Sequence, residues 1–162
     1  MAAPTLTART GGGNIPAGIK LENGYSSVFR FALDPNVSLW AVTTKPPGID
    51  GGDPVNTTTM ENDEWRTKAP GALLDLTEAT MKAAYDPDIY NQAKAMTNLR
   101  QSITQHFPDG STLVFYGYLK SFNANELTEN QMPLADVVII PTNYDPVNNV
   151  EAGPVLTSAA GT

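Results

Sequence analysis

The chain has no cysteine, a single histidine and few charged residues, and each shortage removes a class of function. Without cysteine there is no disulfide framework and no thiolate to act as nucleophile or metal ligand. One histidine, His106, cannot build a His-rich zinc site. Charged residues make up 17% of the 162 residues, below the share of about a quarter that is usual in globular proteins. We therefore expect part of the surface to be covered by something other than water.

Long apolar runs and an excess of positive charge are also missing. No stretch reaches the roughly 18 consecutive apolar residues that a membrane-spanning helix needs. The formal net charge is −7, so the chain lacks the concentrated Lys and Arg side chains with which proteins grip nucleic-acid backbones. An acidic surface repels phosphates instead.

What the chain does contain is the alternation of apolar and polar residues that is typical of β-strands. Phe29, Phe31 and Leu33 alternate with Val28, Arg30 and Ala32, for example. Residues 72–85 have a helix-forming composition but also alternate, and we interpret them as a strand. The turn at 34–36 predicts a hairpin of the first two strands, and “PDG” at 108–110 predicts a second hairpin. The predicted strands are 25–33, 37–44, 72–85, 100–107, 111–122 and 133–141.

One helix is predicted, at about residues 87–98. Asp86 is a favourable N-cap, Pro87 suits the first helical position, and Asp88 complements the positive end of the helix dipole. One apolar stripe follows, formed by Ile89, Ala93 and Met96. The fold class expected from these elements is mainly β: an antiparallel β-sandwich or barrel-like domain with one short helix packed against it.

Three segments lack this periodicity. Residues 1–15 and 146–162 are small, polar and Gly-containing, and we interpret them as flexible terminal arms, for which simple fraying is the more common behaviour and ordering against a neighbour the alternative. They flank a domain at 16–145. Inside it, Lys45–Gly71 contains four Pro and four Gly and predicts a long irregular loop. Loops of this length in compact domains are usually functional or disordered, and the Met60 and Trp65 among its acids favour docking onto a partner.

Sites with recognisable chemistry are weakly represented. His106 lies on the polar face of a predicted strand without a nucleophile beside it, so we interpret it as a cross-strand or solvated residue. The loop acids offer oxygen ligands for Ca²⁺ or a carboxylate pair for a glycosidase, but their spacing matches neither a calcium-binding loop nor a defined catalytic pair. We expect no cofactor and no catalysis. The aromatic residues of 111–122 could stack on sugars, although packing is the more common role of a strand that is apolar on both faces.

Several patterns, in this order, resemble the major tail tube protein of long-tailed bacteriophages. The resemblance covers about residues 16–145. It rests on “GYSSVFRFALDPNVSLW”, “PPGIDGGDPVNTTTMENDEWRTKAPGAL”, “AYDPDIYNQ”, “FPDGSTLVFYGYLKSF” and “MPLADVVIIPTN”. It implies a β-sandwich with a flanking helix that assembles into hexameric rings, which stack into a tube around the tape-measure protein and later conduct DNA. It also implies a virion protein that assembles in the host cytoplasm and meets a tail terminator and distal tail or baseplate proteins.

Candidate contact residues follow from placing this resemblance on the chain. The long loop is expected to reach the neighbouring ring, through Pro46, Asp50, Asp53, Met60, Glu61, Asp63, Glu64 and Trp65. The sheet shared between subunits is expected to involve Phe115, Tyr116, Tyr118 and Lys120, and Glu78 is a candidate for the lumen. Two alternatives remain: a β-sandwich that binds carbohydrate or a receptor, and another tail component such as a distal ring or completion protein.

Overall fold

The computed structural model of the protein describes residues 27–33 and 41–158. The predicted N-terminal arm at 1–15, and the outer parts of the first two predicted strands, lie outside these residues. The described elements, in order, are β1 (Val28–Phe31), β2 (Ala41–Lys45), β3 (Ile49–Asp50), β4 (Val55–Asn56), β5 (Lys68–Ala69), β6 (Asp75–Leu76), β7 (Ala79–Ala84), α1 (Pro87–Met96), β8 (Gln101–His106), β9 (Thr112–Ala124), β10 (Leu134–Pro141), β11 (Tyr144–Asp145), β12 (Val150–Glu151) and β13 (Val155–Thr157).

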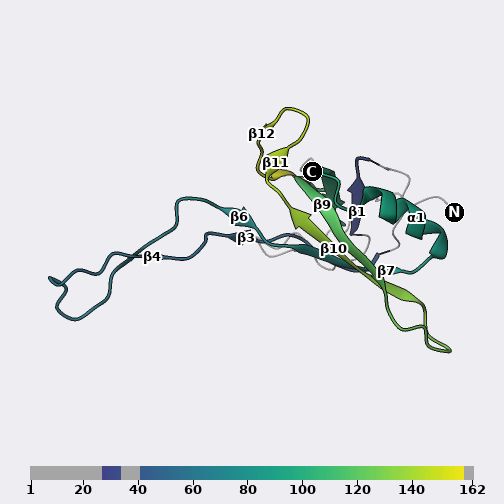
Figure 1. The fold of residues 1–162 in the computed structure, drawn as a ribbon, viewed down its shortest axis with the longest axis horizontal. Coiled ribbons are helices and arrows are strands. Elements are labelled where there is room, and N and C mark those ends of the chain that lie inside the picture. The colour runs from purple at the N-terminus through teal and green to yellow at the C-terminus, as the bar shows by residue number, and fades with distance from the viewer. Residues whose placement is uncertain (1–26, 34–40, 159–162) are drawn as a thin grey trace, which may run out of the picture.

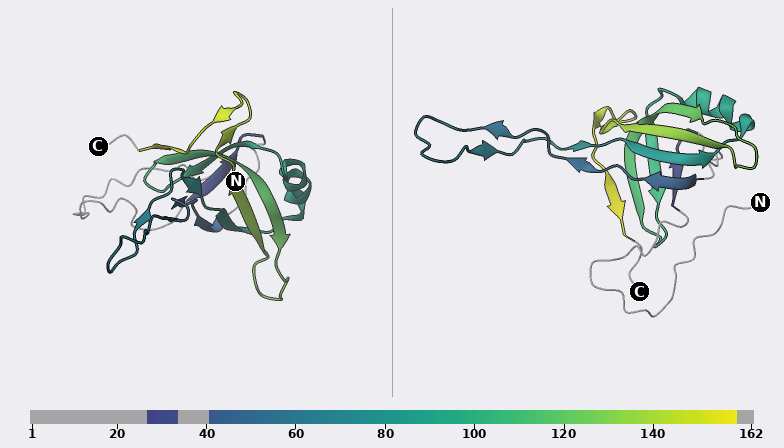
Figure 2. Two further views of the ribbon diagram at one scale, coloured as in Figure 1. Left: turned by 60° about the vertical axis from the view of Figure 1, so that its left-hand side comes forward. Right: turned by 90° about the horizontal axis from the view of Figure 1, so that it is seen from below.

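One curved antiparallel sheet forms the body of the molecule. Its strands follow the order β1-β8-β9-β10-β7-β2, and β13 pairs with β9 beside this path. The sheet wraps around the core without closing into a barrel, and α1 lies across its concave side (Figures 1 and 2). The prediction of a mainly β, antiparallel fold with a single short helix is confirmed.

The predicted hairpin of the first two strands is wrong. β1 pairs with β8 and β2 pairs with β7, so the two strands lie at opposite ends of the sheet path. The residues between them, 34–40, are outside the described part of the chain. Alternation identifies a strand but carries no information about its partner, and here tertiary packing gave each strand a different neighbour.

The second half of the sheet agrees with the sequence prediction. β8 and β9 form the expected hairpin, from the pair Gln101 and Gly117 to the pair His106 and Thr112. β10 then runs antiparallel along β9 on its other side, and β7 confirms the predicted strand at 72–85 over Ala79–Ala84 only. Between β9 and β10 the backbones come close at Gly117, where an added Cβ would lie 2.6 Å from the carbonyl oxygen of Ile140.

The core lies on one face of this sheet, under the helix. Phe29 and Phe115 meet edge to face with ring centroids 6.4 Å apart, and both are buried. α1 begins at its N-cap Asp86, whose side chain accepts a hydrogen bond from the N–H of Asp88. The predicted apolar stripe of the helix is buried against the sheet: Ile89, Ala93 and Met96. The rest of the core consists of Phe31, Ala79, Met81, Ala83, Ile103, Leu119, Val137 and Ile139.

A long two-stranded ribbon projects from this body, and we call residues 46–78 the arm (Figure 1). The prediction of an irregular loop at 45–71 is wrong in this respect, because β3 pairs with β6 and β4 pairs with β5 along it. The ribbon was not predicted because its ladders are only two residues long and because Pro and Gly, which are rare in strands, recur along it. No described helix has the length and apolar character to cross a membrane.

Candidate assembly surfaces

At the root of the arm its two strands are hydrogen-bonded to each other, and the half-buried Leu76 packs against the core of the body. Gly48 N–H donates to the Thr77 hydroxyl at 2.8 Å, and Thr77 N–H donates back to the Gly48 carbonyl at 2.9 Å. The side-chain amide of Asn143 donates to the Asp75 carboxylate at 3.1 Å. The direction in which the arm leaves the sheet is therefore set at its root.

Farther out, the two strands of the arm approach each other closely. A Cβ added to Gly71 would lie 2.5 Å from the carbonyl oxygen of Gly51, closer than real Cβ atoms come to backbone oxygens. The glycine is needed here because only its bare Cα allows the strands to pass between the two short ladders. β4 and β5 then pair from Val55 and Ala69 to Asn56 and Lys68.

The tip of the arm has a defined shape of its own. The N–H of Thr57 donates to the Thr67 carbonyl at 3.0 Å, and their hydroxyls are also 3.0 Å apart. Asn62 closes the turn: its side-chain oxygen accepts from the Thr59 N–H at 2.7 Å, and its amide donates to the Trp65 carbonyl at 3.2 Å. The tip is thus organised by local hydrogen bonds before it meets any partner.

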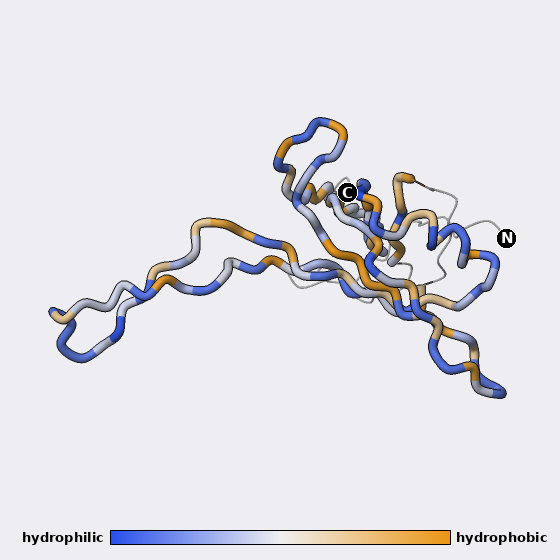
Figure 3. Tube along the Cα trace, in the orientation of Figure 1, coloured by the Kyte–Doolittle hydropathy of each residue, from blue (hydrophilic) through white to orange (hydrophobic). Residues whose placement is uncertain are grey.

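Large apolar side chains stand out in solvent on this arm. Met60 is 106% exposed and Trp65 is 79% exposed at the tip, while Leu73 and Leu74 are exposed nearer the root. Figure 3 shows hydrophobic segments along the arm, well away from the body. All the contact residues predicted for the loop are exposed along the arm: Pro46, Asp50, Asp53, Met60, Glu61, Asp63, Glu64 and Trp65.

The residues predicted for a shared sheet fall on different sides of β9. Phe115 is 1% exposed and belongs to the subunit's own core, so its side chain is not available to a neighbour. Tyr116 and Tyr118 lie half-buried on the opposite face, and Lys120 is exposed. Of the two apolar faces of this strand, the described part of the subunit fully buries only the face that carries Phe115.

Asp145, which the sequence analysis did not single out, holds the turn that follows β11, beside Tyr116. Asp145 is 6% exposed and accepts hydrogen bonds from the Val147 N–H at 2.9 Å and from the Asn148 side chain at 2.7 Å. Burial acts to raise the pKa of Asp145, but these bonds and one from the Tyr116 hydroxyl outweigh it, so the pKa lies below its usual value. Burial and the Asp145 charge raise the pKa of Tyr116. The turn signal was available in the sequence, as “DPVNN” at 145–149.

The same turn is held by Tyr144. Its hydroxyl donates to the side-chain oxygen of Asn149 at 2.8 Å, and the guanidinium of Arg100 lies 5.1 Å from the centre of its ring. This cation–π contact ties the β11–β12 hairpin to the start of β8. Val147, at the end of the hairpin, is left exposed.

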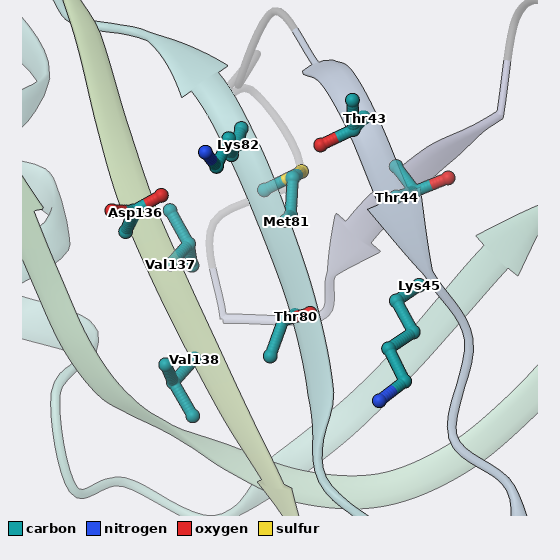
Figure 4. A pocket seen from close by; sticks show the side chains of 9 residues that line it. All are labelled: Thr43, Thr44, Lys45, Thr80, Met81, Lys82, Asp136, Val137 and Val138. Atoms are coloured by element: carbon teal, nitrogen blue, oxygen red, sulfur yellow. The ribbon is translucent and has the colours of Figure 1, made fainter.

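The strands β2, β7 and β10 form an open face of the sheet. A shallow groove of about 340 Å³ runs across it (Figure 4). Lys82 stands directly opposite Asp136 in the β7–β10 ladder. Glu78, the predicted lumen residue, is exposed just before β7 begins. The groove is lined by Thr43, Thr44, Lys45, Thr80, Met81, Lys82, Asp136, Val137 and Val138.

His106 lies on the outer face of β8, opposite Val28 of β1. Burial, and then the positive charge of Arg30, lower its pKa. Within residues 27–33 and 41–158, no group of three or more His, Cys, Asp and Glu side chains is arranged to hold a metal ion.

Comparison with known proteins gives likeness in structure only. No protein-family model and no curated protein matches the chain. Solved structures do match it. A chain from the virion of a native gene transfer agent particle has a TM-score of 0.58 and 16% identity, and the alignment covers 86% of this chain and 99% of that chain.

Two further structures share the fold. A chain from the baseplate of the anti-feeding prophage, resolved with sixfold symmetry, has a TM-score of 0.56 and 7% identity, covering 82% of this chain and 91% of that chain. A chain from the tail of an empty gene transfer agent particle, refined as a helix with C6 symmetry, has a TM-score of 0.51 and 14% identity, covering 75% of this chain and 84% of that chain. At these identities the likeness establishes the fold, which is a fold found in virion, tail and baseplate particles.

Proposed function

We propose that the chain is a structural virion protein that assembles into hexameric rings, which stack into the tube of a phage-type tail. The observation that carries this proposal is the arm. It is hydrogen-bonded along its length, it contributes little to the subunit's core, and it displays Met60 and Trp65 in solvent. A subunit that functioned alone would gain nothing from this exposure, whereas a stacked subunit buries the tip in its neighbour.

The edge strands of the sheet support the proposed ring. Among the described strands, β1 and β2 each have a partner on one side only. An open edge is an aggregation hazard unless another strand completes it. Head-to-tail contacts between copies that close by rotation give a ring, and the sixfold symmetry of two of the structures that share the fold supports a hexamer.

Stacking is assigned to the arm. Between Asp50 and Met60 the extended chain advances about 3.3 Å per residue, so the arm reaches about 30 Å beyond its root. We propose that this reach brings the tip into contact with a copy in the next ring. Met60 and Trp65 are the expected anchors of this contact, because large apolar and aromatic side chains carry most of the energy of protein interfaces. Glu61, Asp63 and Glu64 form the charged rim around them.

The proposed partners are the molecules that a tail tube would contain or meet at its ends. The lumen holds the tape-measure protein during assembly and later conducts DNA, which is not bound because the chain is acidic, with a net charge of −7. Glu78 is proposed to face this lumen. The ends of the tube meet a terminator protein and distal tail or baseplate proteins. Assembly takes place in the host cytoplasm, and no catalytic step is proposed.

Electron microscopy of the purified chain, together with native mass spectrometry, tests the proposal. We expect hexamers in the mass spectrum and sixfold rings or tubes of uniform diameter in the images, in concentrated samples and in phage lysates. A stable monomer at all concentrations, with no rings in either source, would contradict it.

The likeness to a baseplate chain favours one second candidate, a distal ring of the tail. A distal ring occurs once per particle and does not polymerise along the axis. Isolated rings that never stack, with antibody labelling confined to one end of the tail, would support this role. Labelling along the whole tail supports the tube.

A further inference from the structure

β9 has two different partners along the same edge. β10 pairs with it from Gly117 to Ala124, and the N–H of Thr142 then donates to the Tyr116 carbonyl at 2.8 Å. Beyond this point β10 has ended, and the first part of β9 would present bare backbone groups at this edge. β13 takes the vacant place, pairing Val155, Leu156 and Thr157 with Val114, Leu113 and Thr112.

β13 is held in this place almost entirely by its backbone. All three of its residues are exposed, including Val155 at 60% and Leu156 at 62%. Among the described strands it pairs with β9 alone, at the margin of the sheet (Figure 2). Two apolar side chains that remain in solvent add little to the stability of the folded subunit, since hydrophobic stabilisation scales with the area removed from water.

The short segment between β12 and β13 would allow β13 to separate from β9. The last backbone bond before it joins the Ala152 N–H to the Asn143 carbonyl at 3.0 Å. Gly153 and Pro154 then follow, both exposed, and no atom lies within 4 Å of a Cβ added to Gly153. A three-residue strand behind such a linker can move to another sheet without disturbing the core.

We propose that in the assembled particle the place beside Thr112–Val114 is filled by β13 of a neighbouring copy of this chain. We choose a second copy of this chain as the occupant because, in the free subunit, the sequence of β13 already pairs with this edge of β9. Because the donor is identical, exchange re-forms the same ladder and costs little. This inference rests on the proposed assembly of copies into rings, where the donor strand is held close to its acceptor.

The absence of cysteine makes disulfide trapping a clean test. Two double variants, Val155→Cys with Val114→Cys and Leu156→Cys with Leu113→Cys, place cysteines at adjacent pairs of the ladder. Adjacent pairs alternate between hydrogen-bonded and non-hydrogen-bonded geometry, so one variant has the closer Cβ atoms that a disulfide prefers. Each variant is assembled under reducing conditions, oxidised and run on a denaturing gel without reductant. We expect a ladder of covalent multimers and loss of the monomer band.

The matched control uses the same residue of β9. In Thr104→Cys with Val114→Cys the second cysteine lies opposite on β8, which is joined to β9 by a short hairpin. This variant should give only monomers with an internal disulfide. Particles of normal appearance in which the β13 variants also give monomers alone would overturn the strand exchange and leave the proposed function intact.

A mixing experiment remains decisive if the double variants fold poorly. One chain carries only Val155→Cys, and a second chain, with a size tag, carries only Val114→Cys. After co-assembly and oxidation, exchange gives a disulfide between the tagged and untagged chains, whereas pairing within one chain gives none. A wild-type chain that never assembles would contradict the proposed function, and the exchange would fall with it.

Discussion

The body and the arm of this protein are both hydrogen-bonded β-structure, but they are stabilised in different ways. Along β8 every second residue is buried, whereas both residues of β3 and both residues of β4 are exposed. The body folds because its strands share a core. The arm keeps its shape through backbone ladders and the Thr and Asn side chains of its tip, and isolated two-stranded hairpins of this kind are only marginally stable in water. A region that is ordered yet buries so little is expected to be completed by a partner.

The largest loss of stability is expected in the body, from Phe115→Ala. This side chain is 1% exposed and packs edge to face on Phe29. Removing it leaves a cavity under the helix, and such changes cost about 3 to 5 kcal/mol. Chemical denaturation followed by circular dichroism measures the effect. Trp65→Ala, the same kind of truncation in the arm, should change the free energy of unfolding by less than about 0.5 kcal/mol. Equal losses at the two positions would remove the distinction between the regions.

A smaller loss is expected from Gly117→Ala, also in the body. The new Cβ would lie 2.6 Å from the Ile140 carbonyl oxygen and 3.2 Å from the Cα of Pro141, so β9 and β10 must separate. Overpacking of this kind costs about 1 to 3 kcal/mol, measurable in the same denaturation experiment. Gly153→Ala, which has open space around its Cβ, is the control and should leave stability unchanged. Tolerance of alanine at Gly117 would show that the sheet can relax there.

The next effect depends on pH and concerns Asp145. Its pKa is held below the usual value by hydrogen bonds that outweigh burial, so ionised Asp145 favours the folded state. That contribution is complete above the unfolded pKa of about 4 and is lost as pH falls through the lower folded pKa. Asp145→Asn should therefore flatten the fall of the melting temperature between neutral and acid pH. Glu151→Gln removes an exposed carboxylate as the control. An unchanged pH profile in Asp145→Asn would contradict this role.

An effect on assembly without an effect on the fold is expected from Gly71→Ala. Its Cβ would lie 2.5 Å from the Gly51 carbonyl oxygen, which forces the strands of the arm apart and misplaces the tip. The free energy of unfolding should stay within about 0.5 kcal/mol of the wild type, while sedimentation should show fewer large assemblies. Gly51→Ala, with no atom within 4 Å, is the matched control in the same arm. Normal assembly of Gly71→Ala would show that the exact course of the arm is unimportant.

The sequence predicted the body better than the arm, for a physical reason. The alternation at 100–107 and 133–141 arises from one buried face, and the structure confirms these strands and the two-faced apolar strand at 111–122. The helix was predicted from the cap at Asp86 and its apolar stripe, which are local signals. The partners of β1 and β2 were not predictable, because pairing is decided by packing far along the chain.

In the arm, by contrast, there is no buried face and so no periodicity to read. Its ribbon depends on two-residue ladders and on Asn and Thr hydrogen bonds, which short patterns do not distinguish from an irregular loop. The same limit applied to β11, β12 and β13. Of the predicted contact residues, those on the arm are all exposed, while Phe115 proved to be core, because two apolar faces of one strand look alike until the sheet is folded.

The role of the arm in stacking is tested by the double variant Met60→Ala with Trp65→Ala, compared with wild type by native mass spectrometry and electron microscopy. Both side chains are exposed in the free subunit, so the variant should unfold at the wild-type denaturant concentration. Val147→Ala, an equally exposed apolar residue on the β11–β12 hairpin, is the control. We predict that the variant still forms rings but that the rings no longer stack into tubes. Tubes of wild-type length and number would show that the arm does not join one ring to the next.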